Sequence, residues 1–271
     1  MTPDVSLSRT FRTLAGDAVA DAVRRRIVPV IAVAALLSLL AVDSCTSLSV
    51  GTIEINGQVR DVGEAVGWGG LVLFVVLGLW TMVLGGVLAS DHLVQTLDDG
   101  TANLTLARPV GRTSFALARL AGALAITWAT GLVLLLGTAL LLHLRQGLPV
   151  GPALWCTLAC FTGAFVIAAL AMTLSLVLPR AVTALLVFAA IGVQASLDAL
   201  ALFGFQLGGV ALFLERTGPP LLRSQVAALL PWIEPLQPDI SPLDLGLRLG
   251  LWALVSAALL SLSFHRVELG R

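Results

Sequence analysis

The stretch "DDGTANLTLARPVGR", residues 98–112, is a polar link between two long apolar runs. Trp68–Ser90 before it and Leu120–Leu144 after it contain no Asp, Glu, Lys or Arg. Each run is long enough to cross a hydrocarbon core of about 30 Å as a helix. The link therefore predicts two membrane-spanning helices that are joined on one side of a bilayer.

The composition extends this prediction to the whole chain. Of 271 residues, 58% are hydrophobic and only 12% are charged, whereas about 25% charged is usual in soluble domains. Because long uncharged runs recur, we expect an all-α membrane protein with six transmembrane helices in a single transmembrane domain over residues 1–271. The six expected spans are Ile27–Val42, Trp68–Ser90, Leu120–Leu144, Pro152–Leu178, Ala181–Leu197 and Leu249–Phe264.

Two further elements are predicted near the N-terminus. Apolar residues recur at helical spacing through residues 5–26, with arginines and aspartates largely opposite. This pattern indicates an amphipathic helix lying in the membrane interface, or alternatively a helix packed on protein. Short alternating segments flank Asn56-Gly57 in residues 52–61, which predicts a small extracytoplasmic β-hairpin.

The segment after the fifth span is ambiguous. Residues 199–214 are apolar but short, so they could extend the fifth span, re-enter the membrane, or cross it. Pro219-Pro220 could start a short helix with Leu222, Val226 and Leu229 on one face. Six spans with the N-terminus inside put eleven arginines in the cytoplasm and five outside. We therefore expect a multi-pass inner-membrane protein with cytoplasmic N- and C-termini.

Residue usage excludes several kinds of chemistry. All 16 basic residues are arginine, so the chain lacks the lysine of a P-loop or a Schiff base. A net charge of zero predicts no nucleic-acid partner. The chain holds three cysteines, an odd number that predicts no disulfide framework. Because no HExxH or GxSxG motif occurs, we expect no catalytic residue, no metal ligand and no enzymatic activity in this chain.

Two pairs of residues within the spans are candidates for function. Gln194 and Asp198 share a helix face and are a possible part of a transport pathway. Asp198 lies about 25 Å along the helix from Ala181, so we expect it near the outer surface, and mere exposure is an equal alternative. Cys156 and Cys160 share a face too, where apolar packing is favoured over Cu(I) binding.

Residues 91–112 have the pattern of a segment that docks to another protein. Leu93, Val94 and Leu97 form a helical stripe, and Gly100 can end that helix. A proline and a glycine shape the following turn before Arg112. We expect a short helix lying across the cytoplasmic face, where it could fit a groove of a partner and move two spans at once.

The sequence "DDGTANLTLARPVGRTSFALARLAG", residues 98–122, resembles the segment after the second span of type 2 ATP-binding-cassette (ABC) exporter permeases. The resemblance is nearest to the permease of the nitrous-oxide-reductase copper-maturation system. Ala102 and Thr105 depart from it, because leucine is usual there, and the family more often has Glu than Asp99. The residues that match in order are Asp99, Gly100, Thr101, Leu104, Leu106, Pro109, Val110 and Arg112.

The resemblance implies a function and partners. Two copies would form a twelve-span homodimer, and each would dock a separate ATPase subunit, which would hold the ATP and Mg²⁺, so this chain itself would carry no cofactor. Membrane lipid and a possible periplasmic protein are the other expected partners. The expected ATPase-binding residues are Leu93, Val94, Leu97, Asp98, Asp99, Gly100, Thr101, Pro109 and Arg112.

The same resemblance divides the domain into segments, with a coupling segment at 91–114 and an outer gate at 199–245. Between them lie spans three to five at 115–198. The interfacial helix is expected at 5–26, spans one and two at 27–90, and the last span with its tail at 246–271.

Two other functions stay open at this point. An intramembrane lipid-handling enzyme would need polar groups clustered at one membrane depth, and the sequence shows only isolated ones. An ABC-type component of an envelope assembly or mechanical machine would use the same docking segment, residues 91–112, as an exporter. The sequence leaves the substrate and the direction of transport open.

Overall fold

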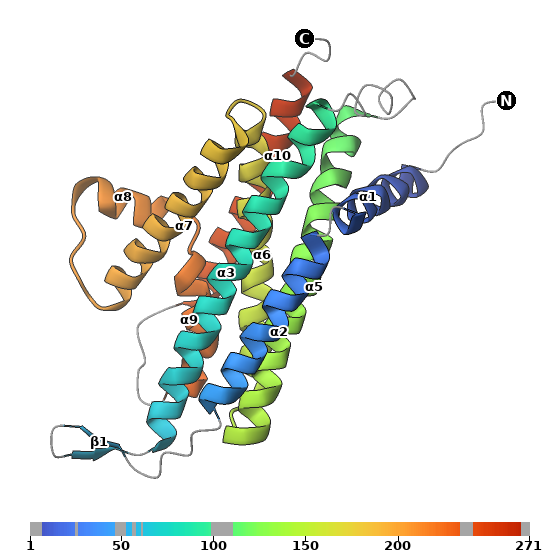
Figure 1. Ribbon diagram of the computed structural model, residues 1–271. Coiled ribbons are helices and arrows are strands. Elements are labelled where there is room, and N and C mark those ends of the chain that lie inside the picture. The colour runs from blue at the N-terminus through green and yellow to red at the C-terminus, as the bar shows by residue number, and fades with distance from the viewer. Residues whose placement is uncertain are drawn as a thin grey trace.

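The fold is a bundle of long helices with one short β-hairpin (Figure 1). The computed structural model describes residues 7–24, 27–46, 53–55, 58–60, 62–98, 111–233 and 241–266. The elements are α1 (Leu7–Arg24), α2 (Ile27–Thr46), β1 (Ile53–Ile55), β2 (Gln58–Arg60), α3 (Val62–Asp98), α5 (Arg112–Gln146), α6 (Val150–Ser175), α7 (Arg180–Leu202), α8 (Gly209–Thr217), α9 (Leu221–Leu229), the 3₁₀ turn η1 (Leu230–Trp232) and α10 (Pro242–Arg266).

Helices α3 and α6 form the centre of the bundle. They pack against each other and against α5, while α7 and α10 flank them and α9 fills the space between. Phe74 of α3, Leu135 of α5 and Cys160 of α6 are fully buried in the main hydrophobic cluster. By contrast α7 and α10 bury only one stripe each, so their remaining apolar faces point outward.

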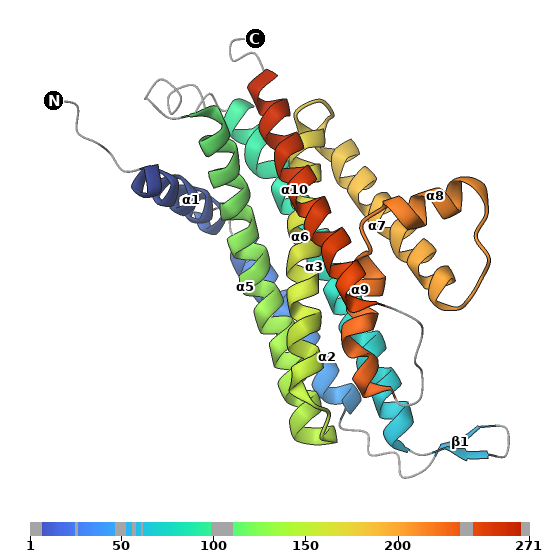
Figure 2. The same ribbon diagram turned by 180° about the vertical axis from the view of Figure 1, so that it is seen from behind.

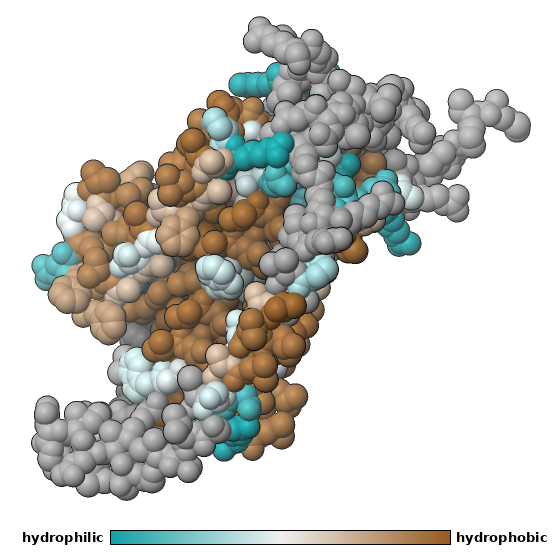
Figure 3. Space-filling model, viewed as in Figure 1, coloured by the Kyte–Doolittle hydropathy of each residue, from teal (hydrophilic) through white to brown (hydrophobic). Residues whose placement is uncertain are grey.

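Five helices are long and apolar enough to cross a membrane, namely α3, α5, α6, α7 and α10. The described part of α2 that is apolar, Val33–Ser44, is shorter than that. Hydrophobic side chains cover most of the described surface in Figure 3. The expected multi-pass membrane fold is therefore confirmed for five helices, and the sixth crossing by α2 stays a prediction.

The two ends of the bundle hold different parts of the chain. The link end holds the last residue of α3, the start of α5 and the end of α10, and the hairpin end holds β1 and β2 (Figures 1 and 2). At the link end, Arg112 Nη1 donates to the carbonyl of His265 at 3.3 Å, and Thr113 Oγ1 lies 3.1 Å from His265 Nε2. Helices α5 and α10 are thereby joined at this end.

Residues 199–214 form no long helix of their own, since they comprise the end of α7, a turn and most of α8. Helix α8 has nine residues and is about 14 Å long, less than half of a hydrocarbon core. Because α10 ends beside the start of α5, Arg112 and Arg266 lie at the same end of the bundle. Residues 199–202 extend α7, and the short returning helix favours re-entry over a further crossing, which both stay predictions.

We predict that the C-terminal tail is cytoplasmic. An Arg271→Cys variant should resist a membrane-impermeant maleimide in intact cells and should react after the cells are opened. A Gln58→Cys variant in β2 is the matched control, and it should react in intact cells. Labelling of Arg271→Cys before lysis would reverse the orientation inferred from the arginine count.

Helix α1 packs directly on α5. A Cβ added to Gly122 of α5 would lie 2.4 Å from Ala18 Cβ. The side chain of Ala18 therefore packs directly on the backbone of α5 at Gly122. Leu14 and Ala18 are buried there, while Arg12 and Asp17 are exposed. The expected helix is present and packs on protein, and its position in a membrane interface remains a prediction.

The polar link differs from the expected shape. Helix α3 continues without a break to Asp98, so residues 91–98 are not the start of a separate helix. No glycine or proline occurs between Ser90 and Asp98 to end it. Helix α5 begins at Arg112, and residues 99–110, including Asp99, Gly100, Thr101 and Pro109, lie outside the described residues.

The predicted hairpin is confirmed. Strands β1 and β2 pair antiparallel, with Glu54 opposite Val59. The Asn56-Gly57 turn lies outside the described residues. On the same side, Arg145 at the end of α5 forms an ion pair with Asp43 near the end of α2, which holds these two helices together at the hairpin end.

Candidate functional site

The chain turns back on itself after α7. Gly204 and Gly209 have φ values of +76° and +56°, in the left-handed region that favours glycine. Between them the chain reverses, and α8 packs beside α7 (Figures 1 and 2). The segment that the sequence left ambiguous is therefore a short helix returning along the fifth long helix.

Asp198 is the anchor for α9. Its Oδ2 accepts hydrogen bonds from the N–H groups of Leu222 at 2.9 Å and Arg223 at 3.2 Å, and its Oδ1 accepts one from Gln194 Nε2 at 3.2 Å. A carboxyl group at a helix N-terminus satisfies amides that have no partner within the helix. The predicted pair Gln194 and Asp198 therefore acts together, and it holds α9 against α7.

Asp198 lies inside the bundle rather than at its surface. Its side chain is 0% exposed, so the expected exposed position near the outer surface is wrong. From Asp198, α9 and η1 run to Trp232, whose Nε1 donates to the carbonyl of Pro149 at 2.9 Å at the start of α6. This path of about 15 Å separates the carboxyl group from the hairpin end.

A second set of charges surrounds the same place. Arg223 of α9 forms an ion pair with Glu215 of α8, which is only 7% exposed. Arg248 Nη2 of α10 donates to the carbonyls of Glu215 at 2.7 Å and Gly218 at 3.1 Å. We call Gln194, Asp198, Glu215, Arg223 and Arg248 the buried polar cluster, since they join α7, α8, α9 and α10.

Such a cluster is unusual within the depth of a membrane. Removing ionised groups from water costs several kcal/mol per ion unless they are paired and hydrogen-bonded. The pairing of Glu215 with Arg223 and the contacts of Asp198 to α9 provide that compensation. The cluster fixes the short helices firmly, and it makes the region a candidate for function.

Helix α9 fits closely against the bare backbone of α3. A Cβ added to Gly78 would lie 2.2 Å from Gln225 Oε1 and 2.6 Å from Cys160 Sγ. A Cβ added to Gly67 would lie 2.1 Å from the carbonyl oxygen of Trp232. No side chain larger than glycine fits at either place without a shift. Both ends of α9 and η1 are therefore set against α3.

The cysteines of the fourth span contribute to the core. Cys156 and Cys160 are both free and fully buried within the main hydrophobic cluster. The favoured interpretation, apolar packing, is confirmed. Among the described residues no group of three His, Cys, Asp or Glu side chains is placed to hold a metal ion.

An ion pair joins two long helices near the link end. Arg180 Nη1 at the start of α7 lies 3.0 Å from Asp91 Oδ1 of α3. Both side chains are about 40% exposed, and such a pair contributes at most about 1 kcal/mol. Its importance lies in its position, because it connects the start of α7 to the last two turns of α3.

The predicted ATPase-binding residues are only partly described. Leu93, Val94, Leu97 and Asp98 lie in the last turns of α3, and their side chains lie outside the described ones. Arg112 donates a hydrogen bond to the end of α10. Arg112 is thus the one predicted ATPase-binding residue whose side chain the structure describes.

Sequence reasoning missed Glu215, Arg223 and Arg248. Glu215 and Arg223 had been placed in the outer segment 199–245, and Arg248 at the outer start of the last span. A usable signal existed for Arg248, which stands alone within the apolar run "LGLRLGLW", residues 245–252. An isolated charge within a span is a sign of function or of a buried partner.

A scan against models of known protein families finds no match for this chain, and a search of curated proteins finds no similar sequence.

Proposed function

We propose that this chain is the permease subunit of an ABC transporter of the type 2 exporter class. It would couple ATP hydrolysis by a separate ATPase subunit to export, or to work on an extracytoplasmic partner. The observation that carries the proposal is the ordered motif of residues 98–112 between two long apolar helices. In this family the motif follows the second span, which corresponds to α3.

The arrangement of α3 and α7 supports the proposed coupling. A force applied to the last turns of α3 would reach α7 through the ion pair of Asp91 with Arg180. It would also reach the last span, because Arg112 donates to the carbonyl of His265. Movement at one end of a rigid bundle is the general basis of alternating access.

The lipid-handling enzyme is the second candidate. The buried polar cluster meets its requirement for polar groups at one depth. However, both oxygens of Asp198 accept hydrogen bonds, and Glu215 is paired with Arg223. Acids that are engaged in holding helices are poorly placed to transfer protons, so transport remains the proposed function.

We predict a complex of two copies of this chain with two ATPase chains. The described monomer leaves wide apolar faces on α7 and α10, with Leu185 at 68% and Leu254 at 72% exposed. A single chain would enclose no pathway across the membrane. The test is native mass measurement of the complex purified with its ATPase from a mild detergent, and a lone monomer that retains full transport activity would contradict the proposal.

A further inference from the structure

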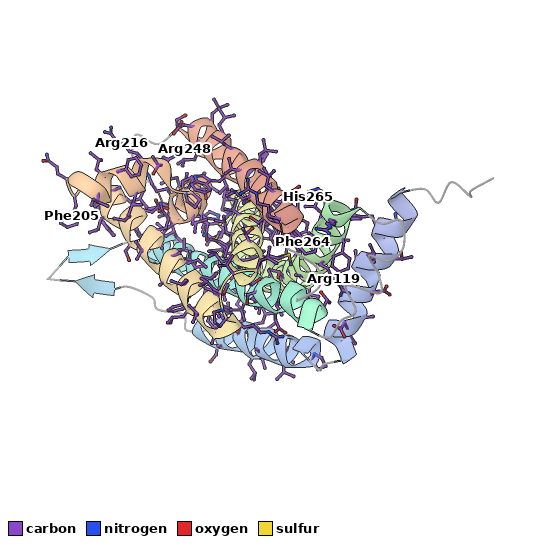
Figure 4. The ribbon with its side chains drawn as sticks, turned by 90° about the horizontal axis from the view of Figure 1, so that it is seen from above. Arg119, Phe205, Arg216, Arg248, Phe264 and His265 are labelled. Atoms are coloured by element: carbon purple, nitrogen blue, oxygen red, sulfur yellow. The ribbon has the colours of Figure 1, made fainter. Side chains whose placement is uncertain are left out.

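A hollow of about 410 Å³ lies between the turn after α7, helix α8 and helix α10. Its lining includes Arg216, Arg223 and Arg248 as well as Glu215, together with the apolar side chains of Phe205 and Leu207. In the view from above, Phe205, Arg216 and Arg248 lie on one side of the molecule, away from Arg119 and His265 (Figure 4). We call this space the arginine hollow.

The arginines outnumber the acids around this space. Three guanidinium groups face two carboxyl groups, those of Glu215 and of Asp198 on the adjoining α9 contact. Arginine remains charged in any protein environment. Among the described residues, the surroundings of the hollow therefore carry one more positive than negative charge, an excess that a bound anion would neutralise.

Hydrogen-bond donors remain for such an anion. Arg248 contacts the two carbonyls through Nη2 alone, which is one of its three nitrogens. The Nε of Arg223 is buried without a hydrogen-bond partner in the described part of the chain. Arg216 is exposed, and neither a hydrogen bond nor an ion pair of its side chain occurs within the described residues.

We propose that the arginine hollow is a binding site for a phosphate group. Guanidinium groups bind phosphate oxygens through paired, charge-assisted hydrogen bonds, and arginine is suited to this geometry. The rim of the site includes the apolar side chains of Leu207, Leu212 and Phe205, and Phe205 is 62% exposed. This rim favours a phosphate carried by a lipid over a free ion, since acyl chains would cover the same surface.

The test measures binding to the purified full chain in neutral detergent, without any ATPase subunit. Its outcome is therefore independent of the proposed transport function. Phosphatidylglycerol should be retained in native mass spectra with saturable affinity, while diacylglycerol of the same chain length should not. Competition by inorganic phosphate distinguishes the two sources, because a free-ion site would bind it and release the lipid.

Arg216→Gln is the decisive variant, because the side chain of Arg216 makes no hydrogen bond or ion pair within the described residues that would stabilise the fold. We expect it to weaken binding about tenfold or more, the effect of losing one charge-assisted hydrogen bond. Arg266→Gln, at the exposed end of α10, is the matched control and should bind as the unmodified chain does. A melting temperature equal to that of the unmodified chain would show that the variant is folded.

Each outcome decides the proposal. Lipid retention that Arg216→Gln reduces supports a lipid phosphate, and phosphate binding that the same variant reduces supports a free oxyanion. Failure of both probes to bind would overturn the proposal. Equal binding by Arg216→Gln and Arg266→Gln would overturn it too, since the hollow would then play no part.

Discussion

An Asp198→Leu variant should lose about 3–5 kcal/mol of stability, enough to leave much of the purified protein unfolded or aggregated. Leucine removes the acceptor for the N–H groups of Leu222 and Arg223 and for the Gln194 amide. Each buried donor left without a partner costs about 1–3 kcal/mol. The substitution would also leave the arginines of the buried polar cluster with one acid fewer.

Two further variants test whether the loss of stability comes from the missing hydrogen bonds of Asp198. Asp198→Asn keeps an acceptor oxygen but removes the charge, so we expect a loss of only about 1–2 kcal/mol. Asp244→Leu makes the same change at an exposed position of α10 and should lie within about 0.5 kcal/mol of the unmodified chain. Thermal unfolding in detergent, followed by gel filtration, measures all three. Equal melting temperatures for Asp198→Leu and Asp244→Leu would contradict the anchoring role.

The second large effect concerns the last turns of α3. Leu93→Asp combined with Leu97→Asp should weaken docking of the ATPase subunit by more than about 100-fold. The two residues are four apart in a helix, so they share a face. Burial of one such side chain in a cleft contributes about 2 kcal/mol. The new charges would also have to be buried in that cleft or exclude the helix from it.

Co-purification of the ATPase with each variant, together with its hydrolysis rate in lipid, is the measurement. Leu144→Asp is the matched control, because it makes the same change on an exposed residue at the hairpin end of α5. Loss of Asp99 or Arg112 should act differently and leave docking intact while hydrolysis becomes uncoupled. If the double variant binds the ATPase at full strength, the docking surface lies elsewhere.

The sequence predicted the long helices because hydrophobic runs of fixed length reflect the thickness of a bilayer. The run Trp68–Ser90 lies within α3, and Pro152–Leu178 largely coincides with α6. Helix ends were less accurate, since α3 extends to Asp98 through residues that are polar but contain no helix breaker. Apolarity locates the part of a helix inside a membrane, whereas a helix can continue beyond that part through polar residues that do not break it.

The candidate site was predicted only in part, because its contacts join four helices. Gln194 and Asp198 were paired correctly from their spacing, yet Asp198 was placed at the surface. Its true partners, the amides of α9, are 24 and 25 residues away, and no local pattern indicates such a contact. The predicted face of α9 was also incomplete, because Leu221 and Gln225 are more deeply buried than Leu222.

The close fit of α9 and η1 against Gly67 and Gly78 has a mechanical consequence. The two glycines are eleven residues apart, or about 16 Å along α3, and both meet backbone or side-chain atoms that a Cβ would strike. A helix held at two points in this way can neither roll nor slip along its support. Helix α3 extends about 46 Å from Asp98 to Gly67. An axial displacement of α3 at its link end would therefore move α9 as well. The same displacement would reach α7 through the hydrogen bonds of Asp198 to α9 and through the ion pair of Arg180 with Asp91.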